Sequence, residues 1–263
     1  MKIHKAYAKV NVFLKITGVR GEYHEIVSRF MKVQNLYDEL SFVSKEQTDF
    51  KENEFVILGD FSCKTEQNTI YKAYFALKEF TKSSSLEKLM RTYAIKVTKN
   101  IPAFAGLGGG SSDAATYLKM CNEVLHLGLS QNELAHIGLK VGADVPFFVY
   151  GYNAANVSGI GEIVEEFEEE LLDFEVYTPK IEISTPRVYQ IYRKDFYAPI
   201  DGFQTAKYKE MSSKELLQSK SADVLNDLFK PALQEYKALK DHYKHGYFFS
   251  GSGSSFFKVK EEN

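Results

Sequence analysis

The residues IPAFAGLGGGSSDAAT, at positions 101–116, place four glycines in five positions directly before helix-forming residues. The first N–H groups of a helix lack partners within the helix, and the helix dipole adds about half a positive charge at that end. Because glycines let the backbone approach a phosphate group closely, this stretch predicts an anion-binding loop. The alternative is a flexible hinge in which Ser112 caps the helix.

Two well-known phosphate loops do not fit the chain. The P-loop requires a Gly-Lys pair, and the chain contains none. The dinucleotide-binding pattern requires a third glycine, where this chain has Ser111. The glycine run therefore belongs to another class of loop.

Asp144 lies in GADVPFF, residues 142–148, before an apolar segment that we predict as a buried strand. A carboxylate at this position can point into a cleft while the strand stays buried, which makes Asp144 a candidate catalytic residue. A capping or turn hydrogen bond is the alternative.

Lys9 and Asn11 are candidates of a second kind, a cation and an amide. They share one face of the strand that AYAKVNVFLKIT, residues 6–17, predicts. Two residues along a strand span about 6–7 Å, so both side chains can reach one ligand. A lysine on a strand can equally be a solvated edge residue.

The composition restricts the function classes. The chain has 263 residues and a net charge of -2, which argues against a dominant role in binding nucleic acid or membrane surfaces. Cys63 and Cys121 lack metal-ligand spacing and predict reduced thiols in a cytoplasmic protein. The scattered histidines predict no protein-ligated metal site, and we expect no export signal or membrane-spanning segment.

The elements that must hold these residues are strands and helices in irregular order. The predicted strands are 6–17, 25–33, 38–43, 93–102, the segment after Asp144, 181–184 and a strand–turn–strand pair in 247–260. The predicted helices are 68–80 with Asn68 as N-cap, one from the glycine loop to about Gly128, one from Ser130 to near Gly142 with Ser130 and Glu133 as a capping box, and most of 213–245. Residues 83–85 are predicted as a serine loop, and Ala232, Leu233, Tyr236, Leu239 and Tyr243 as the apolar face of one last helix. Strict βα alternation is absent, so we predict an α+β fold with two lobes, divided into domains 1–153 and 154–263.

Several stretches resemble one known family. PAFAGLGGGSSDAA resembles the signature loop of the GHMP kinase superfamily. Others resemble its branch that phosphorylates 4-diphosphocytidyl-2-C-methyl-D-erythritol: AYAKVNVFLKITG, Tyr-His-Glu at 23–25, GADVPFF, NVSGIGE at 156–162, TPRVY at 185–189 and SGSGSSFF at 250–257. These stretches follow the order of the family from one end of the chain to the other.

The resemblance implies a two-lobed GHMP kinase fold with its active site in the cleft between the lobes. It also implies transfer of the ATP γ-phosphate, with Mg²⁺, to the 2-hydroxyl of that substrate, giving the 2-phosphate and ADP in non-mevalonate isoprenoid precursor biosynthesis. The implied partner is a small cytidine diphosphate substrate, with no nucleic acid or membrane, and the implied protein is a cytoplasmic monomer or weak homodimer.

Site residues follow from the matching positions. The implied ATP-binding residues are Pro102, Gly106, Leu107, Gly108, Gly109, Gly110, Ser111 and Ser112, with Asn68 and Lys99 near the adenine. The implied catalytic residues are Asp144 and Lys9, and the implied substrate-binding residues are Asn11, Tyr23, His24, Asp144, Thr185 and Tyr189. Gly21 and Glu22 stand in a slightly shortened turn where the family usually has Asp-Gly, which affects the pose of His24.

Simpler roles stay open for several of these residues. Asn68 can be only a helix cap, Lys99 a solvated strand end, and Asp113 a carboxylate that stabilises the helix dipole. The tyrosines can serve packing alone, and the turn at 250–255 can be a plain hairpin or pack beside the phosphate loop.

Two rival functions remain at this point. One is another kinase of the superfamily, acting on mevalonate or homoserine. The other is a nucleotide-binding regulator that has kept the fold and lost catalysis.

Overall fold

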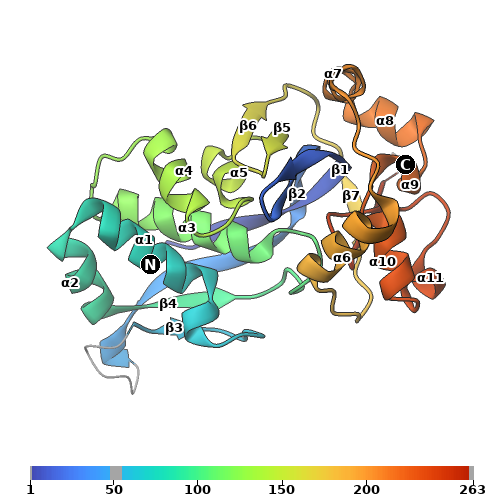
Figure 1. The fold of residues 1–263 in the computed structure, drawn as a ribbon. Coiled ribbons are helices and arrows are strands. Elements are labelled where there is room, and N and C mark those ends of the chain that lie inside the picture. Colours follow the sequence, from blue (N-terminus) through green and yellow to red (C-terminus); the bar gives the residue numbers. More distant parts are fainter. Residues whose placement is uncertain (1, 48–54, 261–263) are drawn as a thin grey trace. The chain divides into compact units, whose positions relative to one another are not determined.

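The structure, a computed structural model, describes residues 2–47 and 55–260 (Figure 1). Contacts divide the chain into two units. Unit 1 takes Met1–Ala8, Leu36–Ile101 and Gly109–Gly151, and unit 2 takes Lys9–Asn35, Pro102–Gly108 and Tyr152–Asn263. The glycine loop therefore belongs to both units, and each half of it is described within its own unit.

Two long strands also contribute residues to both units. These are β1 (His4–Arg20) and β2 (Tyr23–Ser44), and β2 replaces the two strands predicted at 25–33 and 38–43. Gly21, which joins them, has φ +64°, a left-handed conformation that glycine adopts without strain. From Ala8 to Ile16 β1 is buried at every position, so its lysines and asparagine must find partners inside the protein.

In unit 1, residues 39–44 of β2 pair antiparallel with β4 (Tyr93–Thr98), and β3 (Ile57–Leu58) pairs parallel with β4. The helices and 3₁₀ turns are η1 (Lys45–Gln47), η2 (Thr65–Gln67), α1 (Thr69–Thr81), α2 (Ser84–Thr92), α3 (Gly109–Val124), α4 (Gln131–Leu139) and α5 (Val145–Tyr150). Helices α1, α3, α4 and α5 pack against one another (Figure 1).

Local capping predictions in unit 1 are confirmed. The Asn68 side chain accepts a hydrogen bond of 2.9 Å from Ile70 N at the start of α1. Ser130 and Glu133 form a full capping box at the start of α4. Both signals depend only on neighbouring residues, which is why the sequence reveals them.

Two predictions in unit 1 are wrong. The serine loop at 83–85 is the beginning of α2, and the segment after Asp144 is the helix α5, not a strand. Because the apolar run VPFFVY is buried along nearly its whole length, its periodicity does not distinguish strand from helix. Pro146 in the first helical turn and Gly151 in a left-handed C-cap favour the helix.

In unit 2, residues 26–31 of β2 pair antiparallel with β5 (Ala154–Gly159), which pairs with β6 (Ile163–Glu166). A second sheet has the order β7 (Phe174–Tyr177), β9 (Phe256–Val259), β8 (Phe248–Phe249), so the strand–turn–strand prediction for 247–260 is confirmed. The helices are α6 (Thr185–Ile191) with the π-helical η3 (Tyr192–Phe196), α7 (Gly202–Glu210), α8 (Ser213–Ser219), α9 (Ala222–Leu225), α10 (Phe229–Glu235) and α11 (Leu239–His242).

Two predictions in unit 2 are also wrong. Residues 181–184 form no strand, and the single last helix is interrupted between α10 and α11. Tyr236 ends α10 with φ -109° and ψ 74°, outside the helical region. Of the five residues predicted as its apolar face, Ala232 and Leu239 are buried, Leu233 and Tyr236 are partly exposed and Tyr243 is exposed. The apolar pattern therefore indicated burial at only part of the face and did not indicate continuity.

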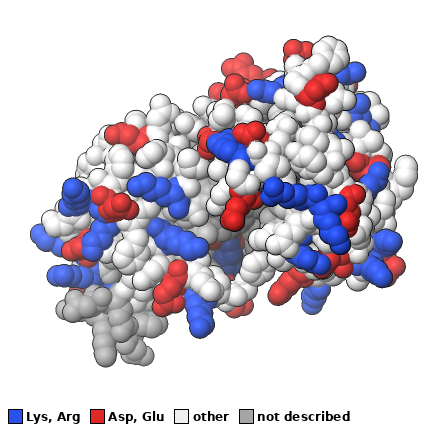
Figure 2. All heavy atoms as spheres, viewed as in Figure 1, with Lys and Arg blue, Asp and Glu red and all other residues white. Residues whose placement is uncertain are grey.

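Surface charge is mixed. On the face that Figure 2 shows, lysine and arginine side chains are interspersed with aspartate and glutamate. In the part of the chain that the structure describes, no helix combines the length and apolar character that a bilayer crossing requires.

Candidate active site

The first half of the glycine loop, residues 102–108, packs within unit 2 against β1 and the turn at 250–255. Gly106 O accepts hydrogen bonds from Ser250 Oγ (2.9 Å) and Lys9 Nζ (3.3 Å), and Lys9 N donates to Leu107 O (3.0 Å). Ser255 N donates to Ala105 O at 3.1 Å. The turn at 250–255 therefore packs beside the glycine loop, and the interpretation of it as only a hairpin is wrong.

Gly106 is required by this packing. Its φ is +74°, and a Cβ atom built there would lie 2.1 Å from Ser250 O. That distance is far below van der Waals contact, so no side chain fits.

Lys9 and Asn11 are buried, with exposed fractions of 3% and 2%. Lys9 Nζ donates to Asn11 Oδ1 (2.6 Å) and lies 4.3 Å above the centre of the Phe30 ring. Asn11 Nδ2 donates to Ser28 Oγ (2.9 Å). The alternative of a solvated edge lysine is wrong: the ammonium group is fixed at the backbone of the glycine loop.

The second half of the loop, Gly109 to Ser112, forms the first turn of α3 in unit 1. Thr69 Oγ1, at the start of α1, donates to Gly110 O (2.6 Å). Ser112 is 2% exposed and lies inside the helix, so the alternative in which it caps α3 is wrong.

Asp144 precedes α5 in the same unit and is partly exposed. Its side chain makes no capping hydrogen bond to α5, so the capping alternative is wrong. The loop that carries it lies beside the start of α3, because a Cβ atom built on Gly142 would be 3.7 Å from Ser111 Oγ. Unit 1 thus brings the Asp144 loop next to the loop serines.

Lys99 belongs to a buried charge cluster that the sequence did not indicate. Its ammonium pairs with Asp38 Oδ2 and, at 2.7 Å, with Asp113 Oδ2. Asp38, fully buried on β2, also accepts hydrogen bonds from Asn100 N (2.6 Å) and Ile101 N (2.8 Å). Lys99 is therefore no solvated strand end, and Asp113 pairs with it. The cluster fixes the backbone that leads into the glycine loop.

The carboxyl group of Asp113 is electrostatically unusual. Burial raises its pKa to about 7, against the opposing effect of Lys99. Its Oδ1 atom is buried and has no hydrogen-bond partner within the described residues. Protonation is therefore less costly for this carboxyl group than for an exposed one.

The residues expected to bind cytidine meet only in part, within unit 2. The rings of His24 and Tyr189 are 5.0 Å apart and tilted by 32°, and Tyr192 approaches His24 edge-on at 6.0 Å. Tyr23 is 65% exposed. Tyr192 was missed, although its place three residues after Tyr189 on one helical stretch was a usable signal.

His24 and Thr185 also have defined surroundings. Burial, with a smaller contribution from Arg193, lowers the pKa of His24, and its Nε2 is buried without a hydrogen-bond partner in the described chain. Thr185 is the first residue of α6, and its Oγ1 lies 2.6 Å from Ser252 Oγ. The neutral imidazole suits the recognition of a polar, uncharged ring edge.

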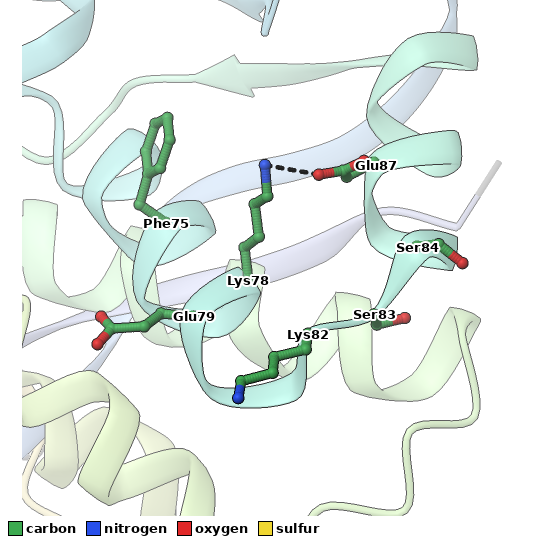
Figure 3. Close-up of a pocket in the computed structure, with 7 residues that line it drawn as sticks. All are labelled: Phe75, Lys78, Glu79, Lys82, Ser83, Ser84 and Glu87. Atoms are coloured by element: carbon green, nitrogen blue, oxygen red, sulfur yellow. Dashed lines mark ion pairs between the residues drawn. The ribbon is translucent and has the colours of Figure 1, made fainter.

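A separate hollow lies between α1 and α2 (Figure 3). It has a volume of about 440 Å³ and is lined by Phe75, Lys78, Glu79, Lys82, Ser83, Ser84 and Glu87. Lys78 and Glu87 form an ion pair of 2.6 Å there. None of the predicted site residues lines this hollow.

Comparison with known sequences gives consistent matches. The family model described as GHMP kinases N terminal domain matches residues 68–152. The chain is 70% identical to a 4-diphosphocytidyl-2-C-methyl-D-erythritol kinase of Sulfurimonas denitrificans, with 100% of this chain and 98% of that protein covered. It is 44% identical to the protein of the same name from Campylobacter jejuni subsp. doylei, with 97% and 99% covered.

Solved structures agree. A crystal structure of a 4-(cytidine 5'-diphospho)-2C-methyl-D-erythritol kinase matches with a TM-score of 0.71 and 26% identity, over 99% of this chain and 90% of that chain. The mevalonate kinase of Methanococcus jannaschii matches with a TM-score of 0.60 and 14% identity, over 99% and 90%. The predicted α+β GHMP kinase fold is thereby confirmed.

Proposed function

Because the chain belongs to the family of 4-diphosphocytidyl-2-C-methyl-D-erythritol kinases, we propose that it transfers the γ-phosphate of ATP to the 2-hydroxyl group of 4-diphosphocytidyl-2-C-methyl-D-erythritol. The products are the 2-phosphate and ADP, in non-mevalonate isoprenoid precursor biosynthesis. The observation that supports this most directly is the hydrogen bond from Lys9 Nζ to Gly106 O, which holds a cation at the glycine loop. A positive charge at this place would stabilise the negative charge of the transferring phosphoryl group in the transition state.

ATP is proposed to bind along the glycine loop and the start of α3. Backbone N–H groups at this helix start attract phosphate oxygens, and the hydroxyl groups of Ser111 and Ser112 supply further donors. Asn68 and Lys99 keep their proposed place near the adenine. For Asn68 this role is additional to its cap of α1, and for Lys99 to its pairing with two carboxylates.

Mg²⁺ is proposed to accompany ATP. Across residues 2–47 and 55–260, no three His, Cys, Asp or Glu side chains gather where they could hold a metal ion. The residues therefore fit an ion that enters with the phosphates rather than one bound by a protein cage. When bound, Mg²⁺ would neutralise charge on the phosphate groups of ATP at the start of α3.

Asp144 is proposed to orient the attacking hydroxyl group and to take its proton. A carboxylate is a far weaker base than an alkoxide, so removing the proton before attack would consume most of an accessible barrier. A loose transition state allows the proton to move late, after the bond to the leaving group has weakened. Positioning is then the larger part of the role of Asp144.

The first test of this role is Asp144→Asn. We expect kcat to fall at least ~10²-fold while ATP affinity stays unchanged, because the carboxamide cannot accept the proton. Asp60→Asn, at an exposed position, serves as the matched control. Near-normal turnover of Asp144→Asn would remove Asp144 from the catalytic role.

Cytidine is proposed to stack on Tyr189, with Tyr23 as a second face and His24 hydrogen bonding to the polar edge of the base. Asn11 and Thr185 complete the proposed substrate contacts. We expect Tyr189→Ala to weaken cytidine binding by about 1–3 kcal/mol while ATP affinity is retained, because a stacking face is lost. Tyr177→Ala, which alters a tyrosine packed on His242, is the control, and unchanged cytidine affinity in Tyr189→Ala would refute the assignment.

An assay of ADP release that compares the cytidine diphosphate substrate with mevalonate and homoserine tests the substrate directly. At 14% identity, the match to the mevalonate kinase above shows a similar fold and carries no information on the substrate. Cytidine-dependent release supports the proposal, and release only with mevalonate or homoserine contradicts it. Absence of turnover with all three would favour the nucleotide-binding regulator.

The remaining proposals concern the whole protein. A cytoplasmic location is favoured by the two free thiols, Cys63 and Cys121. The division into an N-terminal domain, 1–153, and a C-terminal domain, 154–263, stays a prediction. The oligomeric state, a monomer or a weak homodimer, is also still a prediction, and analytical ultracentrifugation would test it.

A further inference from the structure

Asn226 and Asp227 join two elements of unit 2, the strand β1 that carries Lys9 and the turn at 250–255. Asn226 is the C-cap of α9 and precedes α10: its N–H donates to Ala222 O (3.0 Å), and its Oδ1 accepts from the N–H of Leu228, the N-cap of α10 (2.9 Å). The side chain is 2% exposed. The backbone N–H and the side-chain oxygen of Asn226 thus have partners near the two helices, and its side-chain N–H groups donate to other elements.

Those N–H groups hold the turn at 250–255. Asn226 Nδ2 donates to Phe249 O (2.8 Å) and Gly251 O (2.9 Å), the two carbonyls on either side of Ser250. Ser250 in turn donates from Oγ to Gly106 O (2.9 Å) and accepts from Asn11 N (3.3 Å). One amide thus fixes the residue that supports both the glycine loop and the strand of Lys9.

Asp227 holds a second part of the same strand, at Leu14 to Ile16. Its N–H donates to Leu14 O (3.0 Å), its Oδ2 accepts from Ile16 N (2.8 Å), and its Oδ1 pairs with the ammonium of Lys15. Because a strand rises about 3.3 Å per residue, these contacts lie about 10–16 Å along β1 from Asn11. Adjacent residues therefore fix β1 and the turn to one another.

We propose that Asn226, with Asp227, is a positioning residue for the phosphoryl transfer: together they set the distance between β1 and the turn at 250–255, and so the placement of Lys9 against Gly106. This inference rests on the proposed function, because it concerns how Lys9 is held for that reaction. A shift of Ser250 moves the Gly106 carbonyl, which is also the acceptor for Lys9 Nζ. Positioning errors of this kind reduce rate and nucleotide binding without removing any reacting group.

The test is Asn226→Asp in the full chain, which keeps the shape but replaces both N–H donors by an oxygen facing two carbonyls. We expect kcat/KM for ATP to fall about tenfold and the affinity for ADP alone to fall about tenfold, with KM for the cytidine substrate within about twofold. Ser250→Ala, which removes only the hydroxyl group at Gly106 O, is expected to change the same two quantities. It decides the question if Asn226→Asp does not fold.

Asn122→Asp is the matched control, because Asn122 Nδ2 donates to Leu129 O (2.9 Å) and makes a comparable side-chain bridge at the end of α3. At a temperature where circular dichroism shows all variants folded, it should leave ADP affinity and both KM values unchanged. Wild-type ADP affinity and kcat/KM in the folded Asn226→Asp or Ser250→Ala variant overturn the proposal, and so does an equal loss in Asn122→Asp. ADP affinity needs no acceptor substrate, so a wild-type protein inactive on the cytidine substrate would refute the proposed function and still leave this readout to judge the positioning role.

Discussion

The two halves of the glycine loop are held in different ways. In residues 102–108 the backbone itself is packed: Gly106 adopts φ +74° and meets the backbone of Ser250. In residues 109–112 the chain has already become the first turn of α3, and its neighbours are side chains, Thr69 at Gly110 and Ile101 at Gly109. Backbone neighbours cannot rotate away and side chains can, so the two halves should differ sharply in their tolerance of substitution.

The halves also differ in their supporting lysines. Lys9 donates to the neutral oxygens of Asn11 and Gly106, and so links β1 to the loop backbone. Lys99 pairs with the carboxylates of Asp38 and Asp113, and so supports the chain just before the loop and within α3. The first arrangement places a positive charge at the glycine loop itself. The second stabilises the chain segments before and after the loop.

Gly106→Ala should have the largest effect. A Cβ atom would lie 2.1 Å from Ser250 O and 3.2 Å from Gly253 N, at a φ that alanine disfavours. We expect the free energy of unfolding to fall by about 4 kcal/mol or more, with loss of ATP turnover. Urea unfolding and kinetics would measure both, and a stable, active variant would refute the claim that backbone packing restricts this half.

Lys99→Met should come next. It leaves the carboxylates of Asp38 and Asp113 buried without their cation, and removal of one partner from a buried ion pair typically costs about 3–5 kcal/mol. We expect a loss of about 3 kcal/mol in urea unfolding. Lys96→Met, at an exposed position of β4, should change little. If both variants unfold alike, the cluster does not stabilise unit 1.

The pH dependence of stability tests the same cluster. Burial raises the pKa of Asp113 to about 7, above its ordinary 3.8, so the folded state binds a proton more readily than the unfolded state between about pH 4 and 7. The contribution of Asp113 to stability is therefore full below about pH 4 and is lost as the pH rises through 7. Between pH 5.5 and 8 the loss should be about 2 kcal/mol.

Asp113→Asn removes this titration, and the difference in unfolding free energy between wild type and variant should vary with pH over that window. Lys99→Met should raise the pKa of Asp113 further, because the opposing positive charge is gone. A difference between wild type and Asp113→Asn that stays constant from pH 5.5 to 8 would contradict the raised pKa.

Gly110→Ala should have the smallest effect. Its Cβ atom would lie 3.3 Å from Thr69 Oγ1, the end of a side chain that can shift. Alanine gains roughly 0.5–1 kcal/mol over glycine within a helix, which offsets the crowding. We expect the free energy of unfolding to change by less than about 1 kcal/mol. A loss as large as that of Gly106→Ala would show that the two halves are equally restricted.

Whether a feature could be predicted from the sequence depends on how many positions separate the residues that interact. The caps of α1 and α4 were predicted because Asn68, Ser130 and Glu133 act on residues two or three positions away. The start of α3 at the glycine loop was predicted for the same reason. The helix α5 was misread because burial on all sides removes the periodicity on which the prediction depends, although Pro146 and Gly151 were available as signals.

The charge cluster shows the opposite limit. Asp38 and Lys99 are 61 positions apart, and nothing near either residue marks the other as its partner. Lys99 was accordingly read as a solvated strand end or an adenine contact. The same holds for Asn226, whose partners Phe249 and Gly251 come 23 and 25 positions later.

The sequence alone was enough to identify the family, the glycine loop, the helix that follows it and the candidate catalytic residues. Each of these is recognised from a short, continuous run of residues. Only the tertiary structure decided that Gly106 is confined by Ser250, that Lys9 is buried rather than solvated, and that Lys99 is matched by two acids. The physical reason is that burial and charge pairing arise between distant segments, and their strength depends on distances that exist only once the chain has folded.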